Sequence, residues 1–495
     1  MTAEQGLLQG LVAALSYANL LYCLSGALIG TLIGVLPGLG PTATLAILLP
    51  ITYQLPADSA LIMLAGIYYG AQYGGSTTSI LMNLPGEASS VVTALDGHHM
   101  ARDGRAGVAL GIAAIGSFVA GTAATVVIAV LSPPLAALAQ KFGAPEYFAL
   151  MVLGLVAAVA LASGPILKSL AAIFLGLFLG LVGTDVSSDA QRFTFGFLQL
   201  AEGIDFTVIA MGLFGVSEVI IALERPEARS LATSKIDRIF PNREELREAW
   251  PAIARGTGIG TILGILPGGG AILASFASYA VEKRMSRRPE RFGHGEIAGV
   301  AGPEAANNSG AQMSFVPLLT LGIPANSVMA LMLGLMTVKG IIPGPKVIEE
   351  QALLFWSMWI GNAMLLVINL PLVGLWARLV MVPYARLFPA ILLTCCVGVY
   401  SVGLQSFDVL LMSVFALLGY LLRKLGCEPA PLLLGFILGP LLEENLRRTL
   451  LLSGGNPAAF LGSGISVTLL GLALALLISL MLPSLRSKRN AAFVE

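Results

Sequence analysis

The sequence predicts an all-α polytopic membrane protein with about 10–12 transmembrane helices, re-entrant or broken-helix hairpins, and a twofold internal repeat. Three observations predict this class. Hydrophobic residues make up 56% of the chain and charged residues only 11%, whereas a soluble domain has about 25% charged residues. Apolar stretches long enough to cross a bilayer recur from Leu20 to Leu482. One motif of glycine and proline occurs twice.

The duplicated motif divides the chain into two halves. Residues 30–40 read GTLIGVLPGLG and residues 260–270 read GTILGILPGGG, an offset of 230 residues (260 − 30). Glycine at every fourth position clears one face of a helix for close approach of another backbone. The predicted segments are a first membrane repeat (1–224), a cytoplasmic linker (225–250), a second membrane repeat (251–483) and a cytoplasmic tail (484–495).

Each half contains a second proline-centred break, at residues 83–86 and 322–326. The two breaks of a half are 48 residues apart in the first half (85 − 37) and 57 in the second (324 − 267). Irregular backbone survives in a bilayer only when it is buried in protein or faces a wet cavity. Interrupted segments at matching places in two halves therefore indicate a transporter's binding site. Ordinary proline kinks are the alternative.

Basic residues suggest how the halves are oriented. Lysine and arginine concentrate at 102–105, 225–247, 283–291 and 486–489, which the positive-inside rule places in the cytoplasm. The stretch from Pro251 to Val281 is basic on both sides, which favours a re-entrant hairpin. Its counterpart in the first half, from Leu20 to Leu55, has no basic flank. We expect it to enter from the opposite side, which makes the halves inverted repeats. A misplaced helix would make the repeats parallel, so both arrangements stay open.

Hydroxyls, amides and glycines surround the four breaks in otherwise apolar sequence. Free amides at the starts of broken helices favour an anion, and Ser, Thr and Asn oxygens with helix-end carbonyls suit a cation such as Na⁺. Hydrogen bonds within a helix or between helices are the alternative for each side chain. The candidate substrate-binding residues are Gly38, Gly40, Gly75, Ser76, Thr77, Asn83, Pro85, Gly86, Gly268, Gly270, Asn307, Asn308, Ser309, Pro324, Asn326 and Ser327.

Acidic residues within apolar segments are candidates for coupling to Na⁺ or H⁺, because a bare charge at mid-bilayer costs about 2.5–3.5 kcal/mol. The ion-coupling candidates are Glu87, Asp96, Glu304 and Thr320. For Asp96, a loop or capping role is the alternative. We expect no metal centre and no cofactor, because the four cysteines lack the spacing of a zinc site.

At these residues the chain resembles the TctA family, the large permease subunit of the tripartite tricarboxylate transporters. The resemblance covers residues 26–440. The motifs that carry it lie at 34–40, 73–76, 83–87, 96–106, 302–308, 320–324 and 340–345. It implies a permease of the bacterial inner (cytoplasmic) membrane that uses an ion gradient to import a di- or tricarboxylate such as citrate. The implied partners are a small membrane subunit and a periplasmic solute-binding protein. Family members more often carry Gly-Ser where this chain has Ala325-Asn326, which leaves the cargo open.

Other functional classes lack their motifs. The sequence contains no Gly-x-x-x-x-Gly-Lys-Ser/Thr, His-Glu-x-x-His or Gly-x-Ser-x-Gly, so we expect no enzymatic activity. The net charge is zero, which argues against a nucleic-acid partner. A membrane scaffold or channel subunit without active transport, and an intramembrane enzyme, are the alternatives to a transporter.

Overall fold

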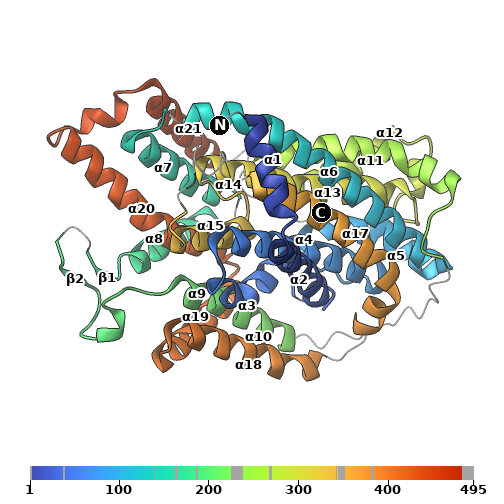
Figure 1. The fold of residues 1–495 in the computed structure, drawn as a ribbon, viewed down its shortest axis with the longest axis horizontal. Coiled ribbons are helices and arrows are strands. Elements are labelled where there is room, and N and C mark those ends of the chain that lie inside the picture. Colours follow the sequence, from blue (N-terminus) through green and yellow to red (C-terminus); the bar gives the residue numbers. More distant parts are fainter. Residues whose placement is uncertain are drawn as a thin grey trace.

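The computed structural model describes residues 3–36, 39–139, 141–161, 165–185, 188–224, 238–266, 270–341, 343, 352–380 and 384–481. Within these ranges the regular structure is almost entirely helical (Figure 1). The exceptions there are strands β1 (Gly183–Thr184) and β2 (Gln191–Arg192), which pair antiparallel. The predicted all-α class is confirmed.

The helices before the predicted linker, with 3₁₀ and π segments written η, are α1 (Ala3–Ala14), α2 (Tyr17–Gly34), α3 (Pro41–Tyr53), α4 (Ala57–Met82), η1 (Ala88–Ser90), α5 (Val91–Met100), η2 (Ala101–Arg105), α6 (Ala106–Ala139), α7 (Ala144–Leu161), α8 (Ile166–Gly180), η3 (Leu198–Leu200), α9 (Phe206–Ala210), η4 (Met211–Val216) and α10 (Ser217–Glu224). The later helices are α11 (Arg243–Leu263), α12 (Gly270–Met285), η5 (Pro289–Arg291), α13 (Ala298–Met313), α14 (Phe315–Leu321), α15 (Ser327–Val338), α17 (Ala352–Val380), α18 (Tyr384–Gly403), α19 (Ser406–Lys424), α20 (Ala430–Leu452), η6 (Pro457–Leu461) and α21 (Gly464–Met481).

Several helices have the length and composition of membrane spans. Among the described residues, five are long and apolar enough: Tyr17–Gly34, Ala88–Leu131, Phe206–Glu224, Leu353–Trp376 and Ser406–Lys424. Shorter apolar helices, including α3 and α15, accompany them. The chain is therefore a multi-pass membrane protein. The number of crossings stays a prediction.

The glycine stripes lie where two pairs of helices pack with their backbones in contact. The stripes described here are the glycines at every fourth position of α2 and α11. A Cβ atom added to any of these glycines would overlap the backbone of the partner helix, so the positions require glycine. Stripe and partner pair as Gly26–Met63, Gly30–Ile67 and Gly34–Ala71 between α2 and α4, and as Gly256–Gly302, Gly260–Ala306 and Gly264–Gly310 between α11 and α13.

Local backbone chemistry explains where the second break of each half begins and ends. The C-cap residue of α4 is Asn83, which adopts the left-handed conformation (φ 55°), and the C-cap residue of α14 is Gly322 (φ 68°). The N-cap residue of α15 is Asn326, whose Oδ1 accepts a hydrogen bond from the Met329 amide at 2.9 Å. Such caps satisfy the free groups of helix ends. The first breaks, around Pro37 and Pro267, lie outside the described residues.

Part of the predicted linker is helical. Helix α11 begins at Arg243, within residues 225–250, and its Glu245 pairs with Arg238 at 2.8 Å and with Arg105 at 3.6 Å. Basic segments from both halves thus meet at one end of the molecule, where Figure 1 places α5, α11 and α12 together. Residues 225–237 and the predicted tail lie outside the described ranges, and the domain boundaries stay predictions.

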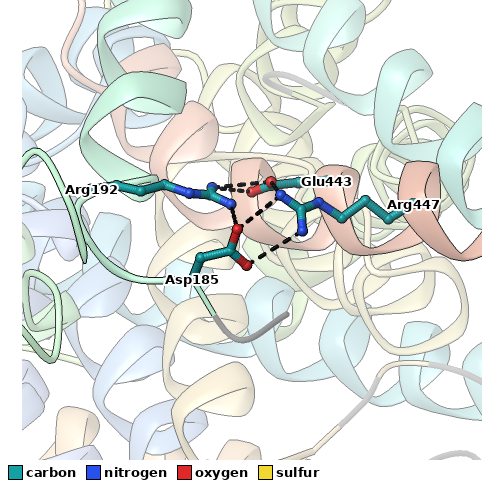
Figure 2. Close-up of polar contacts among 4 residues, drawn as sticks. All are labelled: Asp185, Arg192, Glu443 and Arg447. Carbon is teal, nitrogen blue, oxygen red and sulfur yellow. Dashed lines mark hydrogen bonds and ion pairs between the residues drawn. The ribbon is translucent and has the colours of Figure 1, made fainter. Parts of the chain in front are cut away.

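Four charged side chains join the β1–β2 hairpin to α20 (Figure 2). Arg192 pairs with Asp185 and, at 3.0 Å, with Glu443. Arg447 pairs with Asp185 at 3.0 Å and with Glu443 at 2.7 Å. The hydrogen bonds from Arg192 hold the pKa of Glu443 below its ordinary range. The cluster of alternating charge attaches the hairpin to the helix.

Candidate functional site

A cavity of about 700 Å³ lies among the broken segments. Its wall includes the first turns of α3, α12 and α15 and the loop from Pro85 to Ser89 that leads into η1. Residues following all four predicted breaks therefore line one space. The lining residues are Gly40, Pro41, Thr42, Ala43, Tyr68, Gln72, Pro85, Gly86, Glu87, Ala88, Ser89, Phe214, Glu218, Ile221, Glu224, Ala271, Ile272, Asn326, Ser327, Val328, Arg423, Lys424, Gly426, Cys427, Glu428 and Pro429.

The starts of α3 and α15 meet at this cavity. Thr42 and Ser327 share a hydrogen bond of 2.8 Å between their hydroxyls. Gly40, which precedes α3, has no side chain to cap the helix. Asn326 caps α15 and also donates to the Tyr68 hydroxyl at 3.4 Å. These helix starts direct partial positive charge and amide donors toward the cavity.

The chain after α4 doubles back along that helix. Asn83 reverses the backbone, and Gly86 then packs on Gly75 so closely that a Cβ on Gly86 would overlap the Gly75 backbone. Only glycine allows this approach. The reversal places Glu87 beside α4 and α13, where it accepts a hydrogen bond of 2.7 Å from Asn307 Nδ2.

A second carboxylate, Glu304 of α13, lies close to Glu87 and is 1% exposed. The Ser76 hydroxyl lies 3.0 and 2.9 Å from its two oxygens, and the Thr93 hydroxyl donates to Oε1 at 2.6 Å. The hydroxyl donors come from α4 and α5, so Glu304 joins three helices. Hydrogen bonds of this kind stabilise a buried carboxylate.

The charges around the two carboxylates do not balance locally. Hydroxyls and an amide, rather than lysine or arginine, donate the hydrogen bonds to Glu87 and Glu304 given above. The cavity wall as a whole carries four glutamates against Arg423 and Lys424. Both basic residues are paired, Arg423 with Glu218 at 2.6 Å and Lys424 with Glu224 at 2.5 Å. The formal charge of the wall is thus −2 (2 − 4).

The structure brings some of the predicted residues to the cavity and leaves others in the helix packing. Gly40, Pro85, Gly86, Asn326 and Ser327 line the cavity together with Glu87. Gly75, Ser76 and Asn307 support its wall through the contacts given above. Gly270 is the first residue of α12, directly before the lining residue Ala271, and Pro324 lies in the turn before α15. Gly38 and Gly268 lie outside the described residues.

The remaining predicted residues make hydrogen bonds away from the cavity. Thr77, Ser309 and Thr320 donate to the carbonyl four residues earlier in their own helices, and Asn308 donates to Ser117 and to the Glu304 carbonyl. Asp96 accepts from three backbone amides at residues 293, 295 and 296 and from Tyr279. Asp96 thus clasps a loop, the alternative that its sequence context offered. Roles in binding or coupling stay predictions for all of these residues.

Sequence reasoning missed several side chains at the site. Thr42, Tyr68 and Gln72 line the cavity, and Thr93 binds Glu304. Gln72 lies one helical turn before Ser76, and this spacing on one face of α4 is a signal that could have identified it. Thr93 has no comparable signal, because its distance from Glu304 depends on how α5 packs against α13.

Comparison with known proteins agrees with this architecture. Residues 20–434 match the Tripartite tricarboxylate transporter TctA family. A protein of Agrobacterium vitis described as "Uncharacterized 52.8 kDa protein in TAR-I ttuC' 3'region" is 55% identical over 490 residues, 98% of each chain. A second protein of that organism, "Uncharacterized protein in TAR-II ttuC' 3'region", is 57% identical over 240 residues, 48% of this chain and 99% of its own. No solved structure matches the chain. The chain belongs to the tripartite tricarboxylate transporter TctA family.

Proposed function

We propose that the chain is the permease subunit of an ion-gradient-driven importer, and that its cargo is a di- or tricarboxylate bound in the cavity among the four broken segments. The observation that carries the proposal is the meeting of residues after all four breaks at one cavity. Helix starts supply amide donors to an anion, and the hydroxyls of Thr42 and Ser327 add donors in the same wall.

The charge of the wall supports coupling to a cation. A carboxylate cargo that enters a cavity of formal charge −2 is repelled, most strongly by Glu87. A cation or proton that enters with the cargo removes this repulsion. Glu87 and Glu304 are the groups we propose to receive it, because their hydrogen bonds come from hydroxyls and an amide rather than from basic side chains. A bare charge in a membrane interior is costly. Uptake then follows the cation gradient.

The packing of the stripes supports an internal repeat of two halves, and the unequal basic flanks of the two hairpins support inverted topology. Gly26 meets a residue 37 positions later (63 − 26), and Gly256 meets one 46 positions later (302 − 256). The difference of nine equals the difference between the break spacings of 57 and 48. Each half thus pairs the same two elements, with one insertion between them. We infer that residues 20–55 and 251–281 form re-entrant hairpins from opposite faces.

The mouth of the cavity suggests which face it serves. Lys424 and Glu224 have exposed side chains on the wall, at 53% and 39%, and the basic end of α19 belongs in the cytoplasm by the positive-inside rule. The cavity therefore opens to the cytoplasm in this conformation, the side on which an importer releases its cargo. The proposed partners are the small membrane subunit and a periplasmic solute-binding protein, and the proposed location is the bacterial inner membrane.

Reconstituted uptake tests the proposal. Proteoliposomes that contain both membrane subunits receive the binding protein and radiolabelled di- and tricarboxylates, with an imposed Na⁺ gradient, proton gradient or neither. We expect accumulation of at least one carboxylate that stops when the gradient is removed. Uptake of every accepted cargo without gradient dependence contradicts the coupling.

A pair of variants places the coupling at the site. Glu304→Gln should abolish gradient-driven accumulation, because a neutral amide holds neither a proton nor a cation as a carboxylate does. Glu202→Gln changes an exposed carboxylate in the loop after β2 and should leave uptake at the wild-type rate. Equal uptake by the two variants contradicts a coupling role for Glu304.

A further inference from the structure

We propose that the cavity wall contains a Na⁺ site formed by the carboxylate of Glu87 and the amide oxygens of Gln72 and Asn307. The inference rests on the proposed cation coupling and deepens it, because it names the ion and the atoms that hold it. Neither the family match nor the relatives assign such a site.

Asn307 supplies the first observation. Its Nδ2 donates to Glu87 at 2.7 Å, and its Oδ1 is buried with no hydrogen-bond partner within the described part of the chain. The residue is 0% exposed. A buried carbonyl oxygen without a partner costs about 1–3 kcal/mol, so such an oxygen beside a carboxylate is a candidate ligand for a cation.

Gln72 repeats the arrangement from a different helix. Its side-chain amide lies near Glu87, and its Oε1 is likewise buried and without a partner among the described residues. Because a carboxylate is an acceptor, the amide nitrogen is the atom suited to approach Glu87, and Oε1 is the other polar atom of the same amide. The residue is 1% exposed and lines the cavity. Two amides, one on α4 and one on α13, therefore approach the same carboxylate, and each carries a buried oxygen without a partner in the described part of the chain.

The chemistry of the three groups selects a cation. All the free atoms are oxygens that accept and none is a donor, so a second anion finds no partner there. Hard cations take carboxylate and amide oxygens as ligands. One negative charge with two neutral oxygens balances a monovalent ion.

Glu304 lacks such free oxygens around it within the described residues. Its carboxylate already has two hydroxyl donors, Thr93 and Ser76, and the Ser76 hydroxyl lies within reach of both carboxylate oxygens. Within the described residues, Ser76 and Thr93 have no buried unpartnered oxygen, whereas Gln72 and Asn307 each have one. The first-half break supplies the carboxylate and the second-half helix α13 supplies one amide, so a bound ion ties the two halves together beside the cargo.

Cation binding to the purified protein, without cargo or gradient, tests the site. The protein in detergent is titrated with NaCl, KCl or choline chloride at constant ionic strength, and thermal unfolding and ²²Na⁺ binding are measured. We expect saturable stabilisation by Na⁺ beyond that given by choline. Asn307→Leu and Gln72→Leu should each weaken half-saturation by on the order of tenfold or more.

A matched control comes from α17. Asn369 also has a buried Oδ1 without a partner in the described structure, and its Nδ2 donates to the Leu365 carbonyl rather than to a carboxylate. Asn369→Leu should keep wild-type Na⁺ affinity. If a leucine variant fails to fold, Asn307→Ala and Gln72→Ala are measured instead. Each removes the amide oxygen without placing a branched side chain in the site, so each should weaken Na⁺ binding in the same way.

Each outcome decides the site separately from the proposed function. Equal effects of Na⁺ and choline on the wild type, or wild-type Na⁺ affinity in the Gln72 and Asn307 variants, overturn the site. If proton-driven uptake is observed without Na⁺ binding, the Na⁺ site fails while the proposed transporter stands. Conversely, Na⁺ binding without gradient-dependent uptake retains the site and removes the transporter proposal.

Discussion

At the scale of single residues, hydroxyl and amide groups rather than basic side chains bind the two carboxylates, Glu87 and Glu304. Ser76 is one turn from Gln72 on α4, yet the two act on different carboxylates. The Ser76 hydroxyl donates a hydrogen bond to Glu304, whereas the Ser309 hydroxyl of α13 donates one to the Ala305 carbonyl. Similar side chains thus differ in role according to what accepts their hydrogen bond.

Substitution of these two serines is expected to have unequal effects. Ser76→Ala removes a hydrogen bond to a buried carboxylate, an interaction that contributes about 1.5–3 kcal/mol, so initial uptake should fall about tenfold or more. Ser309→Ala removes a bond within its own helix and should change uptake little. The measurement is proteoliposome uptake normalised to the amount of inserted protein. Equal rates for the two variants would assign Ser76 to packing alone.

At the scale of helices, glycine stripes set the distances that the site requires. Gly260 faces the backbone of Ala306, whereas Gly258 on the same helix has no atom within 4 Å of an added Cβ. The two positions therefore separate the effect of close packing from the effect of helix propensity.

Gly260→Ala should destabilise the protein by about 1–3 kcal/mol, the usual cost of overpacking. Gly258→Ala should be neutral or stabilising by up to about 1 kcal/mol, because alanine favours helix over glycine. Thermal unfolding of the two variants in detergent measures the difference. A Gly260→Ala protein as stable as Gly258→Ala would argue against the α11–α13 contact.

The hairpin cluster makes a prediction about acid. The pKa of Glu443 is lower in the folded protein than in the unfolded chain because Arg192 and Arg447 hold it ionised. Its stabilisation is therefore complete above the unfolded pKa, about 4.3, and is lost as the pH falls through the folded value. The unfolding temperature of Glu443→Gln should be below that of the wild type at pH 7, with a smaller difference near pH 3. A difference that grows on acidification would contradict this assignment.

The second break of each half was predictable because proline, glycine and asparagine restrict or permit the conformation of their own backbone. Asn83 and Gly322 end helices in the left-handed conformation, and these residue types are visible in the sequence. The partners of Glu87 were less accessible to prediction. Gln72 reaches it only because the chain doubles back over Gly75, and Asn307 arrives from the other half. Contacts of this kind depend on tertiary packing.

At the scale of the whole molecule, two halves contribute unequal parts to one site. The first half provides α3, α4 and the Glu87 loop, and the second provides α12 and α15. Asn307 of α13 bonds to Glu87 from behind the wall. The all-α class and the close helix pairs followed from composition and the glycine period. Polar side chains such as Asp96 and Thr320 attracted attention in the sequence, yet they bond to a loop and to a helix carbonyl, because sequence alone does not distinguish a satisfied polar group from a free one.

Protection of a cavity cysteine by cargo tests most directly whether carboxylates bind among the broken segments. Thr42→Cys is placed at the start of α3 in a protein whose Cys396 and Cys427 are replaced by serine, and Asn456→Cys, before η6, is the matched exposed position. Maleimide labelling is timed with and without a carboxylate that the transporter takes up, in Na⁺. We expect the cargo to slow labelling of Thr42→Cys and to leave the labelling rate of Asn456→Cys unchanged. Labelling of Thr42→Cys at the same rate with saturating cargo would contradict it.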